Sequence, residues 1–156
     1  MKIRGNQLWK VPVFCVLAGI VSYYLTIYLG GRFYVVTSPD GVLSIGAVRI
    51  LIWYGILFLA ALLAGWFFLR GMNRRELLCS ATLAAALQLL VLLIQYLFPP
   101  LFLPFGLYLG AIFDWSAFLS QLWFALAGTD ALWVGTLLSL LAPYLFVLFG
   151  RARPAA

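Results

Sequence analysis

Histidine is absent from this sequence, and cysteine occurs only twice, at Cys15 and Cys79. Without histidine there is no histidine-based metal site, no haem held by a histidine, and no Ser-His or Cys-His catalytic pair. The two cysteines lack the C-x-x-C spacing of a redox pair and fall in apolar segments, which favours buried structural thiols. We therefore expect no metal, no cofactor and no enzymatic activity.

Charged residues are also scarce. They make up 9% of the chain, whereas a soluble domain carries about 25%. Hydrophobic residues make up 66% and the mean hydropathy is +1.11, so there is too little polar surface to cover a soluble core. We predict an all-α integral membrane protein. The net charge of +6 is better explained by retention of Lys and Arg in cytoplasmic segments than by nucleic-acid binding, and we expect no nucleic-acid partner.

Four apolar runs are long enough to cross a bilayer, which takes about 20 helical residues. They cover residues 11–30, 50–69, 77–98 and 131–150. The first follows Lys2 and Arg4 as the core of a signal peptide would, but it is longer than the roughly 7–15 apolar residues of such a peptide, and no A-x-A site follows it. We expect a retained first span in a single membrane domain, residues 1–156, with the four spans in an antiparallel bundle.

The connections between the first three runs carry turn and cap signals. "RFYVV" at 32–36 has β character, and "TSPDG" at 37–41 is typical of a turn. Asn73, followed three residues later by Glu76, matches a capping box at the start of a helix. We predict a short extended piece before the turn and a helix start next to Asn73.

The stretch between the third and last runs is compatible with two topologies. A fifth span over residues 105–127 would place Asp114 near the middle of the membrane, where a charge costs about 2.5–3.5 kcal/mol. Alternatively, Asp114 is the N-cap of a separate helix at 114–127 that lies in the outer interface or re-enters the membrane partway. We predict four spans and this short extracytoplasmic helix.

The basic residues set the expected orientation. With four spans, eight of the ten basic residues lie on the cytoplasmic side: Lys2, Arg4, Lys10, Arg70, Arg74, Arg75, Arg151 and Arg153. A fifth span would move Arg151 and Arg153 outward and change the split to six against four. We therefore predict a multi-pass protein of the cell membrane with both termini in the cytoplasm.

Uncharged polar residues within the spans are candidates for a site. Gln88 and Gln95 are seven residues apart in the third span and project from nearly the same helix face. In the last span Pro143 removes one backbone donor and leaves the Ser139 carbonyl without its helical partner, which predicts a kink. Hydrogen bonding between helices is the first interpretation of the two glutamines, and a ligand-binding or permeation role is the alternative. Helix packing is the first interpretation of the kink, and a gate is the alternative.

Four charged residues fall on the predicted outer face and form a candidate charge cluster: Arg32, Arg49, Asp114 and Asp130. We expect either arginine to pair with Asp114 or Asp130, and binding of an anionic lipid headgroup is the alternative.

No motif in the chain resembles that of a known family. The small connections and the few charges within the spans favour a structural or accessory subunit of a membrane complex. The alternative, favoured by Gln88, Gln95 and Pro143, is a channel or transporter component for a neutral or lipophilic solute. The expected partners are the lipid bilayer and another membrane protein or a second copy of this chain.

Overall fold

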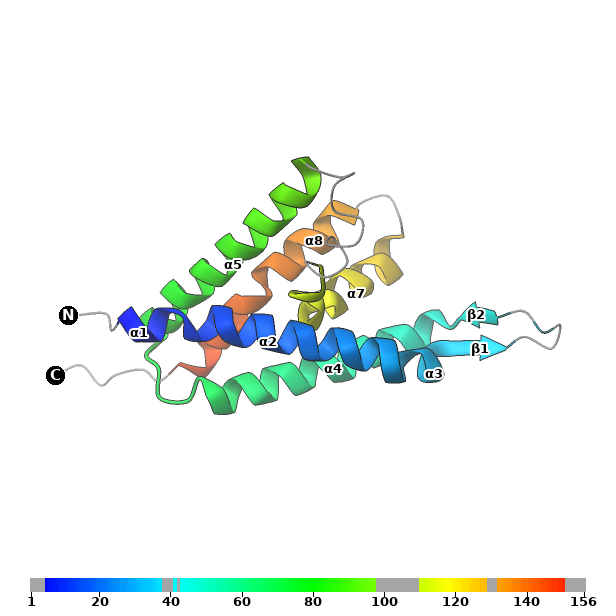
Figure 1. The fold of residues 1–156 in the computed structure, drawn as a ribbon, viewed down its shortest axis with the longest axis horizontal. Helices are drawn as coiled ribbons and strands as arrows, with labels where there is room; N and C mark the ends of the chain where they lie inside the picture. The colour runs from blue at the N-terminus through cyan, green and yellow to red at the C-terminus, as the bar shows by residue number, and fades with distance from the viewer. Residues whose placement is uncertain (1–4, 38–40, 42, 98–109, 129–131, 151–156) are drawn as a thin grey trace.

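The computed structural model describes residues 5–37, 41, 43–97, 110–128 and 132–150. These residues are almost entirely helical (Figure 1). Three of their helices are long and apolar enough to cross a membrane: Lys10–Tyr34, Ala47–Phe68 and Arg74–Leu97. The prediction of an all-α membrane protein is therefore confirmed at this level.

The first long helix is longer than predicted. After the short α1 (Gly5–Leu8), α2 (Lys10–Leu25) continues through a π-helical turn, η1 (Thr26–Gly30), into α3 (Gly31–Tyr34). The predicted end at Gly30 is wrong because Gly30 and Gly31 both keep right-handed helical dihedral angles. Arg32 consequently lies in the last turn of this helix and not beyond it.

Pro12 explains how the start of α2 is held. A proline has no N–H, so it cannot donate a hydrogen bond to the carbonyl four residues earlier, which is that of Leu8. Ser80 from another helix takes this place: its Oγ donates to Leu8 O at 2.6 Å and accepts from Val11 N at 3.1 Å. Ser80 is fully buried, so the hydroxyl satisfies two backbone groups that water does not reach.

A β-hairpin joins the first two long helices. Strand β1 (Val35–Thr37) pairs antiparallel with β2 (Leu43–Ile45), with Val36 opposite Ser44. The extended piece predicted at 32–36 is thus confirmed for Val35 and Val36 and wrong for residues 32–34, which end the first long helix as part of α3. The second long helix, α4 (Ala47–Phe68), begins directly after the hairpin.

The third long helix, α5 (Arg74–Leu97), starts where the capping box predicts. Asn73 N donates to Glu76 Oε2 at 3.1 Å, which is one of the two hydrogen bonds of that motif. Cys79 is exposed on this helix, whereas Cys15 of α2 is buried. The prediction of two buried thiols is therefore correct for Cys15 and wrong for Cys79, which lies off the buried stripe that includes Leu77, Ser80 and Ala81.

The last predicted span is helical but changes type partway. α8 (Leu132–Leu141) is followed by a 3₁₀ helix, η4 (Ala142–Phe149). The change occurs next to Pro143, which cannot donate a hydrogen bond within an α-helix. The continuous apolar helix here, Trp133–Phe149, is shorter than the other three.

Residues 110–128, between α5 and α8, enter the bundle at their start. A 3₁₀ turn, η3 (Asp114–Ser116), leads into α7 (Ala117–Ala127), which lies beside α8 (Figure 1). Trp115 is 1% exposed and stacks on Phe58 and Phe146, with ring centroids 5.9 Å and 5.5 Å apart. Because Phe58 lies near the middle of α4, the start of this segment reaches the middle of the bundle. We call residues 110–127 the re-entrant segment, because their start enters the bundle; their position relative to the membrane stays a prediction.

Candidate functional site

The start of the re-entrant segment lies against the backbone of the first long helix. Gly19 of α2 faces Ala111 and Ile112, and a Cβ added at Gly19 would overlap the Ile112 carbonyl and come within 2.7 Å of Ala111 O. The absence of a side chain at Gly19 therefore lets irregular backbone enter the bundle. Such backbone is tolerated at membrane depth only where it is buried in protein or lines a cavity.

Asp114 is carried into the bundle by this backbone. Its side chain is half-buried, and its Oδ2 is fully buried with no hydrogen-bond partner among the described residues. A carboxyl oxygen buried in this way makes the charged form of the side chain costly. The predicted N-cap role is wrong, because Ser116 occupies the N-cap position of α7 and the start of η3 has no side-chain cap.

One polar residue of the second long helix lies near Asp114, and it lies beside two further polar residues. Tyr54 of α4 lies close enough to Asp114 for an electrostatic interaction, and it also lies close to Thr26. Thr26 Oγ1 also accepts a hydrogen bond from Trp53 Nε1 at 3.1 Å. Thr26 is the first residue of the π-helical turn η1, and such turns are frequent at functional sites. We call Asp114, Tyr54, Thr26 and Trp53 the Asp114 site.

The predicted outer charge cluster does not form among the described residues. Arg32 and Arg49 are exposed, and no ion pair joins either of them to Asp114. Asp130 lies outside the described residues, so its predicted pairing is not tested. The pairing expected for Asp114 fails because its carboxyl points into the bundle, whereas both arginines lie at the hairpin end of their helices.

Gln88 and Gln95 lie at different levels of burial on α5. Gln88 is 4% exposed and continues the buried stripe of this helix. Within the described part of the chain its amide makes no hydrogen bond, whereas Gln95 is partly buried and does interact with another group. Their predicted role in a pathway or as contacts between helices stays a prediction.

Ser139 and Pro143 are both buried on the last helix. Ser139 Oγ donates to Ser116 O at 3.1 Å, so α8 is tied to the first turn of the re-entrant segment. This contact of the hydroxyl was not predicted from the sequence, which pointed to the Ser139 carbonyl. Pro143 lies at the start of η4, at the change from α-helix to 3₁₀ helix.

The chemistry available in this region is that of a single carboxyl group. A carboxyl with a buried, unsatisfied oxygen can take up a proton or accept a hydrogen bond from a water or a solute. Across the described ranges, no three His, Cys, Asp or Glu side chains lie close enough together to hold a metal ion.

Sequence reasoning missed Tyr54 as a neighbour of Asp114, and the link between Trp53 and Thr26, because these residues come from helices far from Asp114 in the chain. The sequence does show an aspartate inside an otherwise apolar stretch. This pattern is equally typical of a helix cap in a loop and of a buried carboxyl. In comparisons with known proteins, no protein family, no curated protein and no solved structure matches this chain.

Proposed function

We propose that this chain is a small accessory subunit of a membrane complex that contacts a larger membrane protein through its β-hairpin. The observation that carries the proposal is the exposure of Leu43 and Ile45 on β2, at 71% and 64%. The hairpin extends past the ends of α3 and α4 (Figure 1), so these apolar side chains lie beyond the helices that the hydrocarbon core would cover. Apolar side chains on a short strand pair with open edges favour a protein contact.

The proposed topology has four crossings with both termini in the cytoplasm. Leu8, Arg74 and Gly150 lie at one end of the bundle, because Ser80 bonds Leu8 O and Arg74 Nε donates to Gly150 O at 3.2 Å. The last helix has ten α-helical and eight 3₁₀ residues. At rises of about 1.5 and 2.0 Å per residue these cover about 31 Å, close to the roughly 30 Å hydrocarbon core.

Cysteine labelling tests this topology. In a Cys79→Ala background, Ser44→Cys should react with an impermeant maleimide in intact cells. Ala156→Cys should react only after the membrane is permeabilised. Reaction of Ala156→Cys in intact cells would show an odd number of crossings and reject the four-span arrangement.

Co-purification tests the subunit proposal. The tagged chain is isolated from its native membranes in mild detergent, and the mass and composition of the particle are determined. We expect a stoichiometric partner that is lost in the double variant Leu43→Glu with Ile45→Glu. Ser44→Glu adds a charge to the opposite face of the same strand and should keep the partner. A wild-type particle that contains only this chain would reject the proposal.

A second candidate function is a channel or transporter component, and the position of Asp114 is the observation that favours it. The spans predicted from the sequence contain no acidic residue that could couple transport to ions. Asp114 brings such a group into the bundle, and ionisable groups in this position commonly serve in ion or proton pathways. Proton entry into liposomes, followed with a pH-sensitive dye, should fall in Asp114→Asn if this candidate is correct. Equal proton entry with the wild type, the variant and empty liposomes would reject it.

A further inference from the structure

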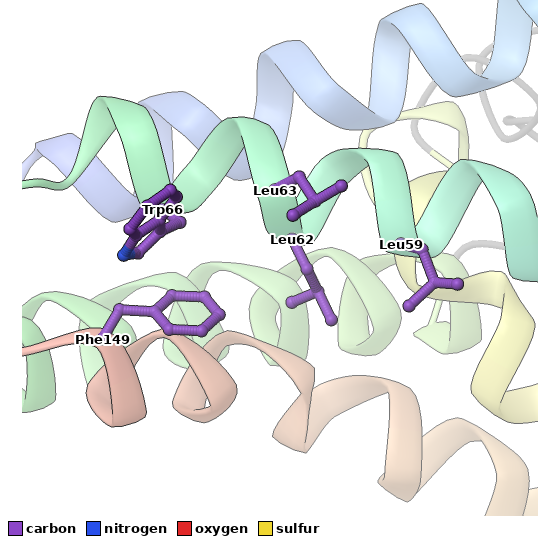
Figure 2. A pocket seen from close by; sticks show the side chains of 5 residues that line it. All are labelled: Leu59, Leu62, Leu63, Trp66 and Phe149. Atoms are coloured by element: carbon purple, nitrogen blue, oxygen red, sulfur yellow. The ribbon is translucent and has the colours of Figure 1, made fainter.

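An apolar groove runs along the outside of α4 toward the end of η4. Its volume is about 400 Å³, and it is lined by Leu59, Leu62, Leu63, Trp66 and Phe149. The four α4 side chains follow one face of the helix, and Phe149 closes the groove at the Trp66 end (Figure 2). Leu59 and Leu63 are 61% and 62% exposed, so the described part of the chain leaves this face open.

Among the described residues, basic side chains lie at the Trp66 end of the groove. Arg70 follows Trp66 by one helical turn, and its guanidinium lies over the indole ring at 5.9 Å from the ring centroid. Arg74 and Arg75 begin the next helix at the same end. The only acidic side chain near this turn in the described ranges is Glu76, whose Oε2 is engaged by Asn73 N. This end of the groove therefore complements an anion.

The length of the groove matches half a bilayer. Leu59 and Arg70 are eleven positions apart, and Arg70 lies just after the end of α4 at Phe68. At 1.5 Å per residue this separation corresponds to about 16 Å along the helix axis. Half of the roughly 30 Å hydrocarbon core is about 15 Å. An acyl chain that begins at the level of Arg70 would thus end near Leu59, whereas a spanning helix from a partner would extend well past the groove.

We propose that this groove binds one acyl chain of an anionic phospholipid, with the headgroup phosphate at Arg70. Arginine suits this role because its fixed planar set of donors matches a phosphate, while its stacking on Trp66 holds it at the rim of the groove. We expect selectivity between anionic and zwitterionic phospholipids to come from the headgroup alone. The acyl chains of both kinds of lipid fit the apolar side chains of the groove equally well.

Photocrosslinking with the full-length chain in liposomes tests the proposal. The probes are phosphatidylglycerol and phosphatidylcholine, each with a diazirine in one acyl chain, and labelled residues are mapped by peptide mass spectrometry. At equal mole fraction, phosphatidylglycerol should label the 59–66 segment about fivefold more than phosphatidylcholine, the factor expected when one arginine attracts an anionic headgroup near the surface. The exposed residues Leu89, Leu90 and Leu93 of α5 should be labelled equally by both probes.

Three variants separate headgroup binding from other causes. Arg70→Gln should abolish the difference between the probes at 59–66, and Arg70→Lys should keep part of it. Leu63→Trp fills the groove and should lower labelling by both probes without changing α5. Equal labelling of 59–66 by both probes in the wild type would overturn the proposal, as would crosslinking of this segment to a second copy of the chain in place of lipid.

Discussion

Gly19 of α2 and Ile112 of the re-entrant segment lie in backbone contact, with no room for a side chain at Gly19. The two residues are far apart in the chain, and their contact brings the start of the segment, with Asp114 and Trp115, to the middle of the bundle. The position of the candidate site therefore depends on one glycine in another helix.

Substituting this glycine should destabilise the protein. Gly19→Val places a side chain where the Ile112 carbonyl lies, and overpacking of this kind costs about 1–3 kcal/mol. We expect a lower thermal midpoint in detergent. Gly31→Ala is the matched control, because a Cβ at Gly31 meets no atom within 4 Å, and its midpoint should be unchanged or slightly higher. A Gly19→Val protein that melts like the wild type would contradict the close contact.

Ser80→Ala should weaken the attachment of the first helix. The variant removes the hydroxyl that bonds both Leu8 O and Val11 N, and a buried polar group left unsatisfied costs about 1–3 kcal/mol. The free energy of unfolding, measured by titration with a denaturing detergent, should fall by this order. Ser44→Ala loses only an exposed 3.3 Å hydrogen bond to Val36 O, and it should change the value by less than about 0.5 kcal/mol. Equal effects of the two substitutions would argue against the Ser80 contacts.

Asp114→Asn should stabilise the protein at neutral pH. The carboxyl oxygen Oδ2 is fully buried and has no hydrogen-bond partner among the described residues. Burying a charge without a partner costs more free energy than burying a neutral polar group, and asparagine removes the charge while it keeps the shape of the side chain.

The thermal midpoint in detergent at about pH 7.5 measures this effect. It should be higher in Asp114→Asn than in the wild type. A midpoint equal to or below that of the wild type would show that Asp114 is not held in an apolar environment.

Glu76→Ala should destabilise the start of α5 through loss of its hydrogen bond with Asn73 N. Losing a helix cap costs about 0.5–2 kcal/mol, and hydrogen exchange of the first-turn amides should become faster. Glu76→Gln keeps an oxygen that can accept the same hydrogen bond, and it should lie between alanine and the wild type. No difference between alanine and glutamine would remove the capping interpretation.

Local features of this fold were predictable because their causes are local. The capping box at Asn73 and Glu76 and the extended Val35 and Val36 before the turn each depend on a few neighbouring residues. At Pro143 the sequence predicted an irregularity in the form of a kink, and the structure has a change to 3₁₀ helix there. The predicted ends of the helices were less accurate, since glycines such as Gly30 and Gly31 permit a helix to continue as readily as to stop. Cys79 was misplaced because an apolar helix gives little indication of which face is buried.

Composition alone determined that this is an all-α membrane protein, because a chain with so few charges cannot cover a soluble core and must satisfy its backbone within helices. It did not determine whether the start of the segment around Asp114 packs on the outside of the bundle or within it, since the same residues suit either position. Only the tertiary structure decided this, through the close approach at Gly19, the stacking of Trp115 between Phe58 and Phe146, and the bond from Ser139 to Ser116. These contacts join helices that are distant in sequence, and their geometry is a property of the packed bundle.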